Sequence, residues 1–238
     1  MTVPRRVILR NAVLQDIKTI ALRQMVEQGT AAVSLRAIAR EIAMSPAALY
    51  HYYASRDDLI TALILDSYIN LGQSLQSSYD LLQQEAPANR VIGMTRAYRN
   101  WALEHPIEYQ LIFGNPIPGY SAPMPVTQPA AQQAFFPLAQ LLLILWQEKA
   151  IHIPEMYTHI PETIQPQLES WGAAFLQAVS AEDACKVFPL LYLGVILWTR
   201  LHGLVTLELF HQLTPMIGDA SAMFEHESRH TLYLLGLK

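Results

Sequence analysis

The stretch from Ser34 to Asp58 constrains the fold of this chain more than any other part of its sequence. It reads S-L-R-A-I-A-R-E-I-A-M-S-P-A-A-L-Y-H-Y-Y-A-S-R-D-D. Ser34 and Ser45 can each cap a helix through the side-chain hydroxyl. Pro46 suits a first helical position, because an N–H would have no partner there. Apolar residues after Ser34 repeat as one helical face, formed by Leu35, Ile38, Ala39 and Ile42. We therefore predict two short helices joined by a tight turn.

The second of these helices has a small and polar outer face. Leu49 and Tyr53 fall one turn apart and should point inward. The residues left for the outer face are Ser45, Ala47, Ala48, Tyr50, His51 and Tyr52. Alanines let a helix backbone approach base edges, while hydroxyl and imidazole groups can donate to phosphates or bases. This pattern predicts a helix-turn-helix whose second helix docks in the major groove. Two packed helices with an accidental polar face are the alternative, which the agreement of caps, proline and spacing disfavours.

The same residues resemble the DNA-binding segment of the TetR family of transcriptional regulators. The family pattern ends in L-Y-x-x-F, followed by a short turn, a lysine, an acidic pair and a leucine. Tyr53 stands here in the place of the phenylalanine, and Arg56 in the place of the lysine. Both changes keep the role of the residue, so the resemblance implies that Arg56 is a cation for phosphate. Ser34 and Arg36 complete the predicted DNA-binding set, with Arg36 acting on the DNA backbone.

Charge is distributed unevenly along the 238 residues, whose net charge is −4. Residues 1–56 hold eight Lys and Arg against three acids, a balance of +5, and the remainder holds eight against seventeen, a balance of −9. A basic end on an acidic body is typical of a DNA-binding module joined to a domain that does not touch DNA. Charged residues make up only 15% of the chain and hydrophobic residues 52%, so we expect part of the surface to be buried against a partner.

The predicted fold class is all-α, because glycines are few and no β-type alternation appears. We expect a three-helix helix-turn-helix DNA-binding domain in residues 1–56 and a larger helical ligand-binding and dimerisation domain in residues 57–238. Residues 1–8 are expected to form an arm, either along the phosphate backbone or disordered. The prolines of residues 115–129 predict a loop. Further helices are predicted at 9–28, 56–84, 88–104, 106–113, 135–151, 162–179, 183–212 and 215–235.

Residues 198–203, W-T-R-L-H-G, resemble the Trp-His-Gly signature of one subclass of TetR C-terminal domains. Residues 105–119 are also similar to that subclass. The resemblance implies a pocket for a small, largely apolar ligand within residues 90–205. Its candidate lining residues are Tyr98, Trp101, Tyr109, Phe113, Trp146, Phe175, Trp198 and His202. A packed tryptophan beside a hydrogen-bonded core histidine remains the alternative for Trp198 and His202.

The sequence His226-Glu227-Ser228-Arg229-His230 matches the H-E-x-x-H motif of zinc proteases. A helical metal-dependent hydrolase is therefore the alternative function. We disfavour it because a third ligand usually follows this motif, whereas the eight residues after His230 include no His, Asp or Glu. The sequence also contains no recognisable nucleophile triad or phosphate loop. We therefore expect no enzyme activity, no cofactor and no metal.

The resemblance implies a ligand-responsive regulator that binds a near-palindromic double-stranded operator as a homodimer, through a four-helix interface of C-terminal helices. Leu193 is expected on that surface. We expect the regulator to be a repressor, although an activator would use the same DNA-binding unit. A ligand-sequestering module is disfavoured by the intact outer face of residues 45–52. Cys185 is the single cysteine, and the most apolar run, Val187 to Trp198, is too short for a membrane span, so we expect a cytoplasmic protein.

Overall fold

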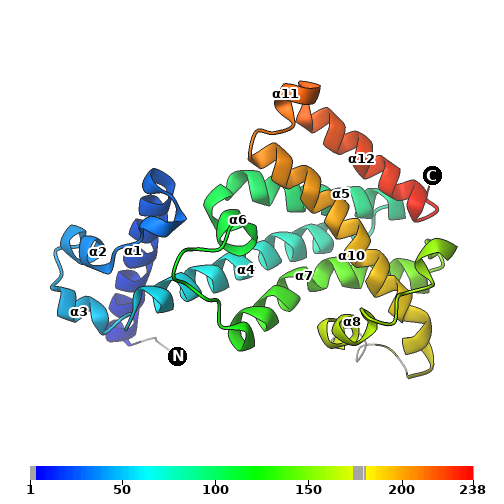
Figure 1. The fold of residues 1–238 in the computed structure, drawn as a ribbon. Coiled ribbons are helices and arrows are strands. Elements are labelled where there is room, and N and C mark those ends of the chain that lie inside the picture. Colours follow the sequence, from blue (N-terminus) through cyan, green and yellow to red (C-terminus); the bar gives the residue numbers. More distant parts are fainter. Residues whose placement is uncertain (1–3, 174–178, 180, 238) are drawn as a thin grey trace. The chain divides into compact units, whose positions relative to one another are not determined.

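The computed structural model describes residues 4–173, 179 and 181–237. Its contacts divide the chain into two compact units. Unit 1 comprises Met1–Tyr68 and His105–Ala130, and unit 2 comprises Ile69–Glu104 and Ala131–Lys238. Among the described residues every regular element is a helix, which confirms the predicted all-α class (Figure 1).

Unit 1 is built on the N-terminal helices. Its elements are α1 (Arg5–Gln28), η1 (Thr30–Ala32), α2 (Leu35–Glu41), α3 (Pro46–Tyr50), α6 (Pro106–Phe113) and the first parts of α4 (Arg56–Leu81) and α7 (Met124–Gln147). Its core contains the fully buried residues Ile17, Ala21, Met25, Ile38, Ala39, Leu49, Leu59 and Ile60. Leu111 and Ile117 join the same core, so residues far along the chain help to hold the N-terminal helices together.

The two predicted serine caps are confirmed. The hydroxyl of Ser34 accepts from the Ala37 N–H at 3.3 Å, and that of Ser45 accepts from the Ala48 N–H at 3.2 Å. Between the two helices Ala43 adopts a φ of 54°, and the Met44 N–H donates to the Ala39 carbonyl at 2.8 Å. Each cap satisfies a backbone donor that a helix start leaves without a partner.

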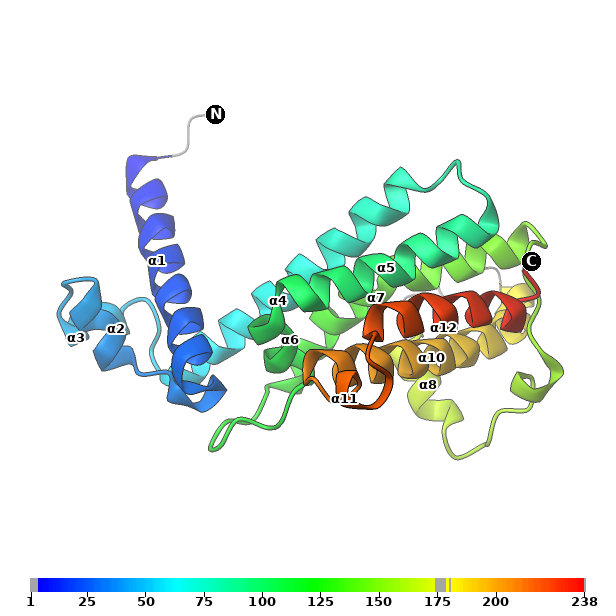
Figure 2. The same cartoon turned by 90° about the horizontal axis from the view of Figure 1, so that it is seen from above.

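Unit 2 contains the remaining parts of α4 and α7 and the later helices. These are α5 (Pro87–Glu104), η2 (Glu155–Tyr157), α8 (Gln165–Trp171), α10 (Ala181–Leu209), α11 (Thr214–Ile217) and α12 (Ala220–Leu234). Helices α5, α10 and α12 contact one another pairwise and lie side by side (Figure 2). Tyr98, Trp101, Leu193, Val205 and Phe224 are buried in this unit.

Three predicted element boundaries were wrong. Arg5 and Arg6 belong to the first turn of α1, not to an arm. Helix α7 already begins at Met124, so the predicted loop at 115–129 is too long; Pro125 is tolerated there because first-turn N–H groups have no helical partner. The predicted helix 215–235 is divided at Gly218, whose φ is 75°. Of the predicted helix 162–179, residues 174–178 lie outside the described residues.

Candidate nucleic-acid interface and the aromatic cluster of unit 2

The sorting of inward and outward residues on α3 agrees with the sequence pattern. Leu49 is 0% exposed and Tyr53 is 8% exposed, so both belong to the core of unit 1. The outer residues are exposed or half-buried: Ser45, Ala47, Ala48, Tyr50, His51 and Tyr52. Helix α3 ends at Tyr50, so His51 and Tyr52 lie in the turn that follows it. The outer face is therefore one short helix plus a turn.

Basic side chains lie on the surface of the same unit. Arg36 and Arg40 are exposed on α2, and Arg10 is exposed on α1. The guanidinium carbon of Arg10 lies 5.1 Å from the centre of the Tyr52 ring, so a cation from α1 stands beside the outer face. The sequence does not reveal Arg10 as a member of this surface, because a contact across 42 positions leaves no local signal.

Arg56 also has a structural role that the sequence does not reveal. Its Nε donates to the Val33 carbonyl at 3.2 Å, and its Nη2 donates to the Ala31 carbonyl at 3.0 Å. These carbonyls lie in the connection before α2, so the guanidinium ties the start of α4 to the start of the helix-turn-helix. A phosphate contact from Arg56 stays a prediction.

Replacing Arg56 by alanine should lower the free energy of unfolding by about 1–3 kcal/mol, because two charge-assisted hydrogen bonds are lost. DNA affinity should fall for all sequences alike. Denaturant unfolding and DNA binding at several salt concentrations would measure both effects. If Arg56 also contacts a phosphate, the salt slope should flatten by roughly one unit. Arg56→Lys is the matched variant: it keeps the charge but loses the fork that reaches both carbonyls. Unchanged stability in Arg56→Ala would contradict the structural task.

The helices of unit 1 are also joined by buried or half-buried polar contacts. Lys18 Nζ lies 2.5 Å from Asp66 Oδ2, which pairs α1 with α4. The Tyr120 hydroxyl lies 2.9 Å from Thr61 Oγ1, so the segment after α6 is hydrogen-bonded to α4. Burial, together with the charge of Asp66, raises the pKa of Tyr53 to about 12, so its phenol is neutral at physiological pH. Within unit 1, side-chain contacts therefore join α4 both to α1 and to the segment after α6.

Three of the candidate ligand residues come together in unit 2. The Tyr98 hydroxyl lies 2.8 Å from His202 Nδ1. The rings of Trp198 and His202 stack with centroids 4.8 Å apart, as expected for residues one helical turn apart. Phe135, which the sequence analysis did not single out, packs edge-on against Trp198 at 5.7 Å. Burial lowers the pKa of His202, so its imidazole is neutral near pH 7. We call Tyr98, Phe135, Trp198 and His202 the aromatic cluster.

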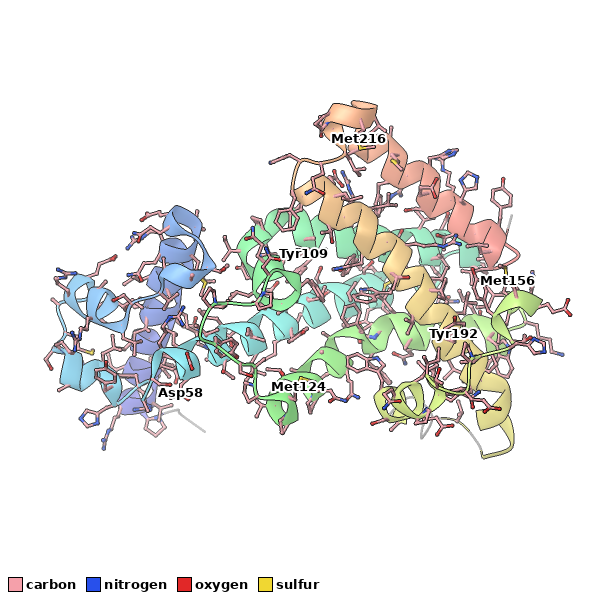
Figure 3. All side chains as sticks on the ribbon, in the orientation of Figure 1. Asp58, Tyr109, Met124, Met156, Tyr192 and Met216 are labelled. Atoms are coloured by element: carbon pink, nitrogen blue, oxygen red, sulfur yellow. The ribbon has the colours of Figure 1, made fainter. Side chains whose placement is uncertain are left out.

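The other candidate ligand residues lie elsewhere. Trp101, which is 2% exposed, donates from its indole nitrogen to Asn70 Oδ1 at 2.7 Å. Trp146 is half-buried on α7. Tyr109 lies on α6 (Figure 3) and belongs to unit 1, as does Phe113 of the same helix. Their ring centroids lie 5.1 Å apart. Phe175 lies outside the described residues.

Ion pairs hold α5 against α10 and α12 around the aromatic cluster. Arg99 binds the carboxylate of Glu208 with both Nε and Nη2, at 2.7 and 2.5 Å, and each side chain is 14% exposed. The guanidinium of Arg99 also lies 5.1 Å from the ring centre of Phe224. Arg96 pairs in the same bidentate way with Glu225 of α12, at 2.7 and 2.6 Å, but at a more exposed position. The Arg96 guanidinium lowers the pKa of Glu225.

The capped pair of short helices, with an exposed polar face beside the exposed arginines of α1 and α2, defines a helix-turn-helix DNA-binding protein. Residues 19–63 match the family model described as bacterial regulatory proteins of the tetR family. Residues 91–231 match the model described as the tetracyclin repressor-like C-terminal domain. The chain belongs to the TetR family of DNA-binding transcriptional regulators.

Similar proteins agree with this assignment over nearly the whole chain. The HTH-type transcriptional regulator Rv1816 of Mycobacterium tuberculosis is 30% identical over 225 residues, which cover 92% of this chain and 91% of the relative. The crystal structure of SCO4313, described as a regulatory protein, has a TM-score of 0.74 at 31% identity and covers 97% of this chain and 100% of that one. A structure from Rhodococcus sp. RHA1, with a TM-score of 0.66 at 18% identity over 94% of this chain and 95% of that one, shares the fold.

Proposed function

We propose that this regulator is a repressor that binds a near-palindromic operator as a homodimer in the cytoplasm and is released by a small-molecule inducer. Residues 1–56 are proposed as the DNA-binding domain and residues 57–238 as the ligand-binding and dimerisation domain, without catalytic activity. The proposal rests on the outer face of α3. Its exposed alanine is small enough for the helix to approach base edges, and its polar side chains can donate hydrogen bonds to DNA. One helix this short reads only a few base pairs, so paired half-sites require two copies.

The proposed DNA contacts divide into two kinds. Arg36, Tyr50 and Tyr52, with Arg40 and Arg10 beside them, would set affinity through the phosphate backbone. Ala47, Ala48 and His51 would meet base edges and so set sequence preference. Ser34 and Ser45 would act through the caps that hold the starts of α2 and α3.

Operator binding tests this assignment. Footprinting on DNA that flanks the protein's own gene should show a protected near-palindrome. Tyr50→Ala and His51→Ala should each cost about 1–3 kcal/mol of operator binding, with Tyr50→Ala weakening all sequences and His51→Ala altering preference at one position. His159→Ala, an exposed histidine outside unit 1, is the matched control. Unchanged binding in both the Tyr50 and the His51 variant would show that α3 is not the recognition helix.

We propose that the aromatic cluster contributes one wall of the inducer pocket. Its rings offer apolar contact, while the Tyr98 hydroxyl and the neutral His202 imidazole offer polar groups for a ligand. Such a wall suits a largely apolar ligand with a hydrogen-bonding substituent. The remaining candidate lining residues stay predictions: Trp101, Trp146, Tyr109, Phe113 and Phe175. Membership of the Trp-His-Gly subclass also stays a prediction.

We propose that α10 and α12 form the dimer interface. Leu193 was wrongly expected on that surface, since it is 0% exposed within the chain itself. A different stripe of α10 is available: Leu207 and Phe210 are 38% and 42% exposed. Gly203 lies on this stripe, and a Cβ added to it would meet no atom of the described residues within 4 Å, apart from the adjacent backbone of its own helix. The open space above Gly203 supports close approach by a helix of a second copy.

Helix α4 supports a mechanical link between ligand and DNA. It is one helix from Arg56 to Leu81, and it contributes residues 56–68 to unit 1 and residues 69–81 to unit 2. We propose that the inducer shifts α4 and so changes the spacing of the two recognition helices. Operator DNA must then weaken inducer binding by the same factor, because coupling between two binding sites is reciprocal.

A further inference from the structure

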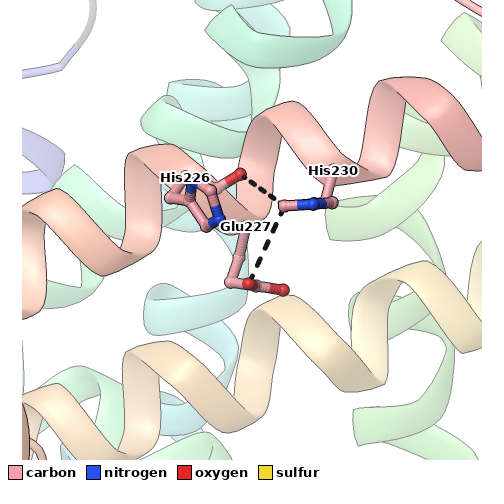
Figure 4. Close-up of side chains that lie close together, drawn as sticks. All are labelled: His226, Glu227 and His230. Carbon is pink, nitrogen blue, oxygen red and sulfur yellow. Dashed lines mark hydrogen bonds and ion pairs between the residues drawn. The ribbon is translucent and has the colours of Figure 1, made fainter.

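Helix α12 carries three metal-ligating side chains on its surface. His226, Glu227 and His230 each offer one ligand atom, and these atoms all lie within 4.8 Å of one another (Figure 4). The two imidazole centroids are 4.5 Å apart, because residues four positions apart share one side of a helix. Tetrahedral zinc places its ligand atoms about 3.4 Å apart, given bonds of about 2.0–2.1 Å. Both histidines are exposed, so rotamer changes can close the remaining distance.

The ring of His230 is oriented so that it can bind a metal ion together with His226 and Glu227. Its Nδ1 lies 3.3 Å from the backbone carbonyl oxygen of His226 and 3.9 Å from Glu227 Oε1. Metal-ligating histidines usually have one ring nitrogen engaged by a carbonyl or a carboxylate, which fixes the ring plane. The local contacts of His230 therefore hold its imidazole on the side of α12 where His226 and Glu227 lie (Figure 4).

The opposite face of α12 is firmly anchored in unit 2. Phe224 is 1% exposed, Ser228 is 2% exposed and Leu232 is 8% exposed, so this face is buried. Glu225 adds the bidentate contact to Arg96 of α5. A site on an anchored helix binds without having to order its backbone first, which lowers the entropic cost of binding. The ligand set is therefore preorganised up to side-chain rotation.

We propose that His226, Glu227 and His230 bind one first-row transition-metal ion of the zinc class. Two imidazoles and one carboxylate suit Zn²⁺, whereas Mg²⁺ and Ca²⁺ prefer all-oxygen sites. This departs from the expectation of no metal, which rested on the lack of a third ligand after His230; Glu227 is proposed as the third ligand here. The three residues serve here as a binding site on the side of α12 that faces away from the buried Phe224, Ser228 and Leu232, where bound metal stabilises the helix. The exposed stripe that supports the proposed dimer contact lies on α10, so the metal site does not occupy it. The proposal does not depend on the DNA-binding assignment.

Calorimetric titration of the metal-free full-length chain with ZnCl₂ tests the site directly. We expect one zinc ion per chain and no comparable heat from MgCl₂. His226→Ala and His230→Ala should each weaken binding by at least about tenfold, and Glu227→Gln by a smaller factor. Zinc at about a hundredfold above Kd should raise the midpoint of thermal unfolding by roughly 5–10 °C in the parent and not in the histidine variants.

Two control variants separate this site from other zinc ligands. His159→Ala removes an exposed histidine elsewhere, and Cys185→Ser removes the chain's single thiol; both should bind zinc like the parent. Circular dichroism should show unchanged helix content in every variant, and His226→Gln with His230→Gln replaces the alanine variants if either loses helix. Parental zinc affinity in both histidine variants, or loss of binding in Cys185→Ser alone, would overturn the proposal.

Discussion

Replacing Gly203 by arginine is expected to convert the proposed dimer into folded monomers. Among the described residues, no atom outside the neighbouring backbone of α10 lies within 4 Å of a Cβ at this position, so a side chain can leave the helix there without a clash at its first atom. Arginine in a helix interior also gains up to about 1 kcal/mol over glycine. A second copy packed closely against Gly203 would instead meet a long, charged side chain beside Arg200. The substitution therefore opposes association while favouring the helix.

Light scattering after gel filtration would measure the mass of the Gly203→Arg variant, and circular dichroism its helix content. Operator affinity should fall by about 10²–10⁴-fold, because a monomer binds one half-site without the benefit of the second. Ser77→Arg is the matched control, since it adds the same charge at an exposed position of α4. A Gly203→Arg protein that remains fully dimeric would place the interface away from this stripe of α10.

Replacing Glu208 by glutamine is expected to destabilise unit 2 by about 3 kcal/mol. Glu208 and Arg99 are each only 14% exposed, and removing the charge of Glu208 leaves the Arg99 guanidinium with only the weaker interactions of Glu225 and Asp219 to offset its burial. The glutamine amide oxygen still accepts one hydrogen bond, which places the expected loss at the lower end of the usual range. The midpoint of thermal unfolding should fall by roughly 6–12 °C.

Glu225→Gln is the control for this prediction, because it makes the same chemical change in the neighbouring bidentate pair. Arg96 is 49% exposed and Glu225 is 31% exposed, so solvent screens their interaction. We expect a loss below about 1 kcal/mol there. Thermal and denaturant unfolding of both variants would provide the comparison. Equal losses of unfolding free energy in the two variants would show that burial does not determine how much the Arg99–Glu208 pair contributes to stability.

Local features of the sequence were sufficient to predict the two short helices of the helix-turn-helix. A serine cap acts three residues along the chain, so Ser34 and Ser45 could be assigned before any tertiary contact was known. Helical periodicity separated buried Leu49 from exposed Tyr50 for the same reason. The start of α7 was missed because proline is both a loop residue and a residue of the first helical turn, and only the surrounding structure selects one.

Contacts between distant residues could not be predicted. Arg99 and Glu208 are separated by 109 positions, and Arg56 reaches carbonyls more than twenty positions earlier. The aromatic cluster was only partly anticipated, since Phe135 joins Trp198 through the packing of α7 and α10. Leu193 was placed on the surface because a helix that is apolar nearly all round does not reveal which side its own chain covers.

The sequence by itself determined the helical class, the family and the inward and outward faces of α3, because these depend on spacing within a few turns of one helix. Only the tertiary structure decided which charges are paired, which side of α10 stays uncovered, and that His226, Glu227 and His230 stand on the outside of an anchored helix. Those properties depend on how helices far apart in the chain pack together, and burial and the distance between charged groups are set by that packing.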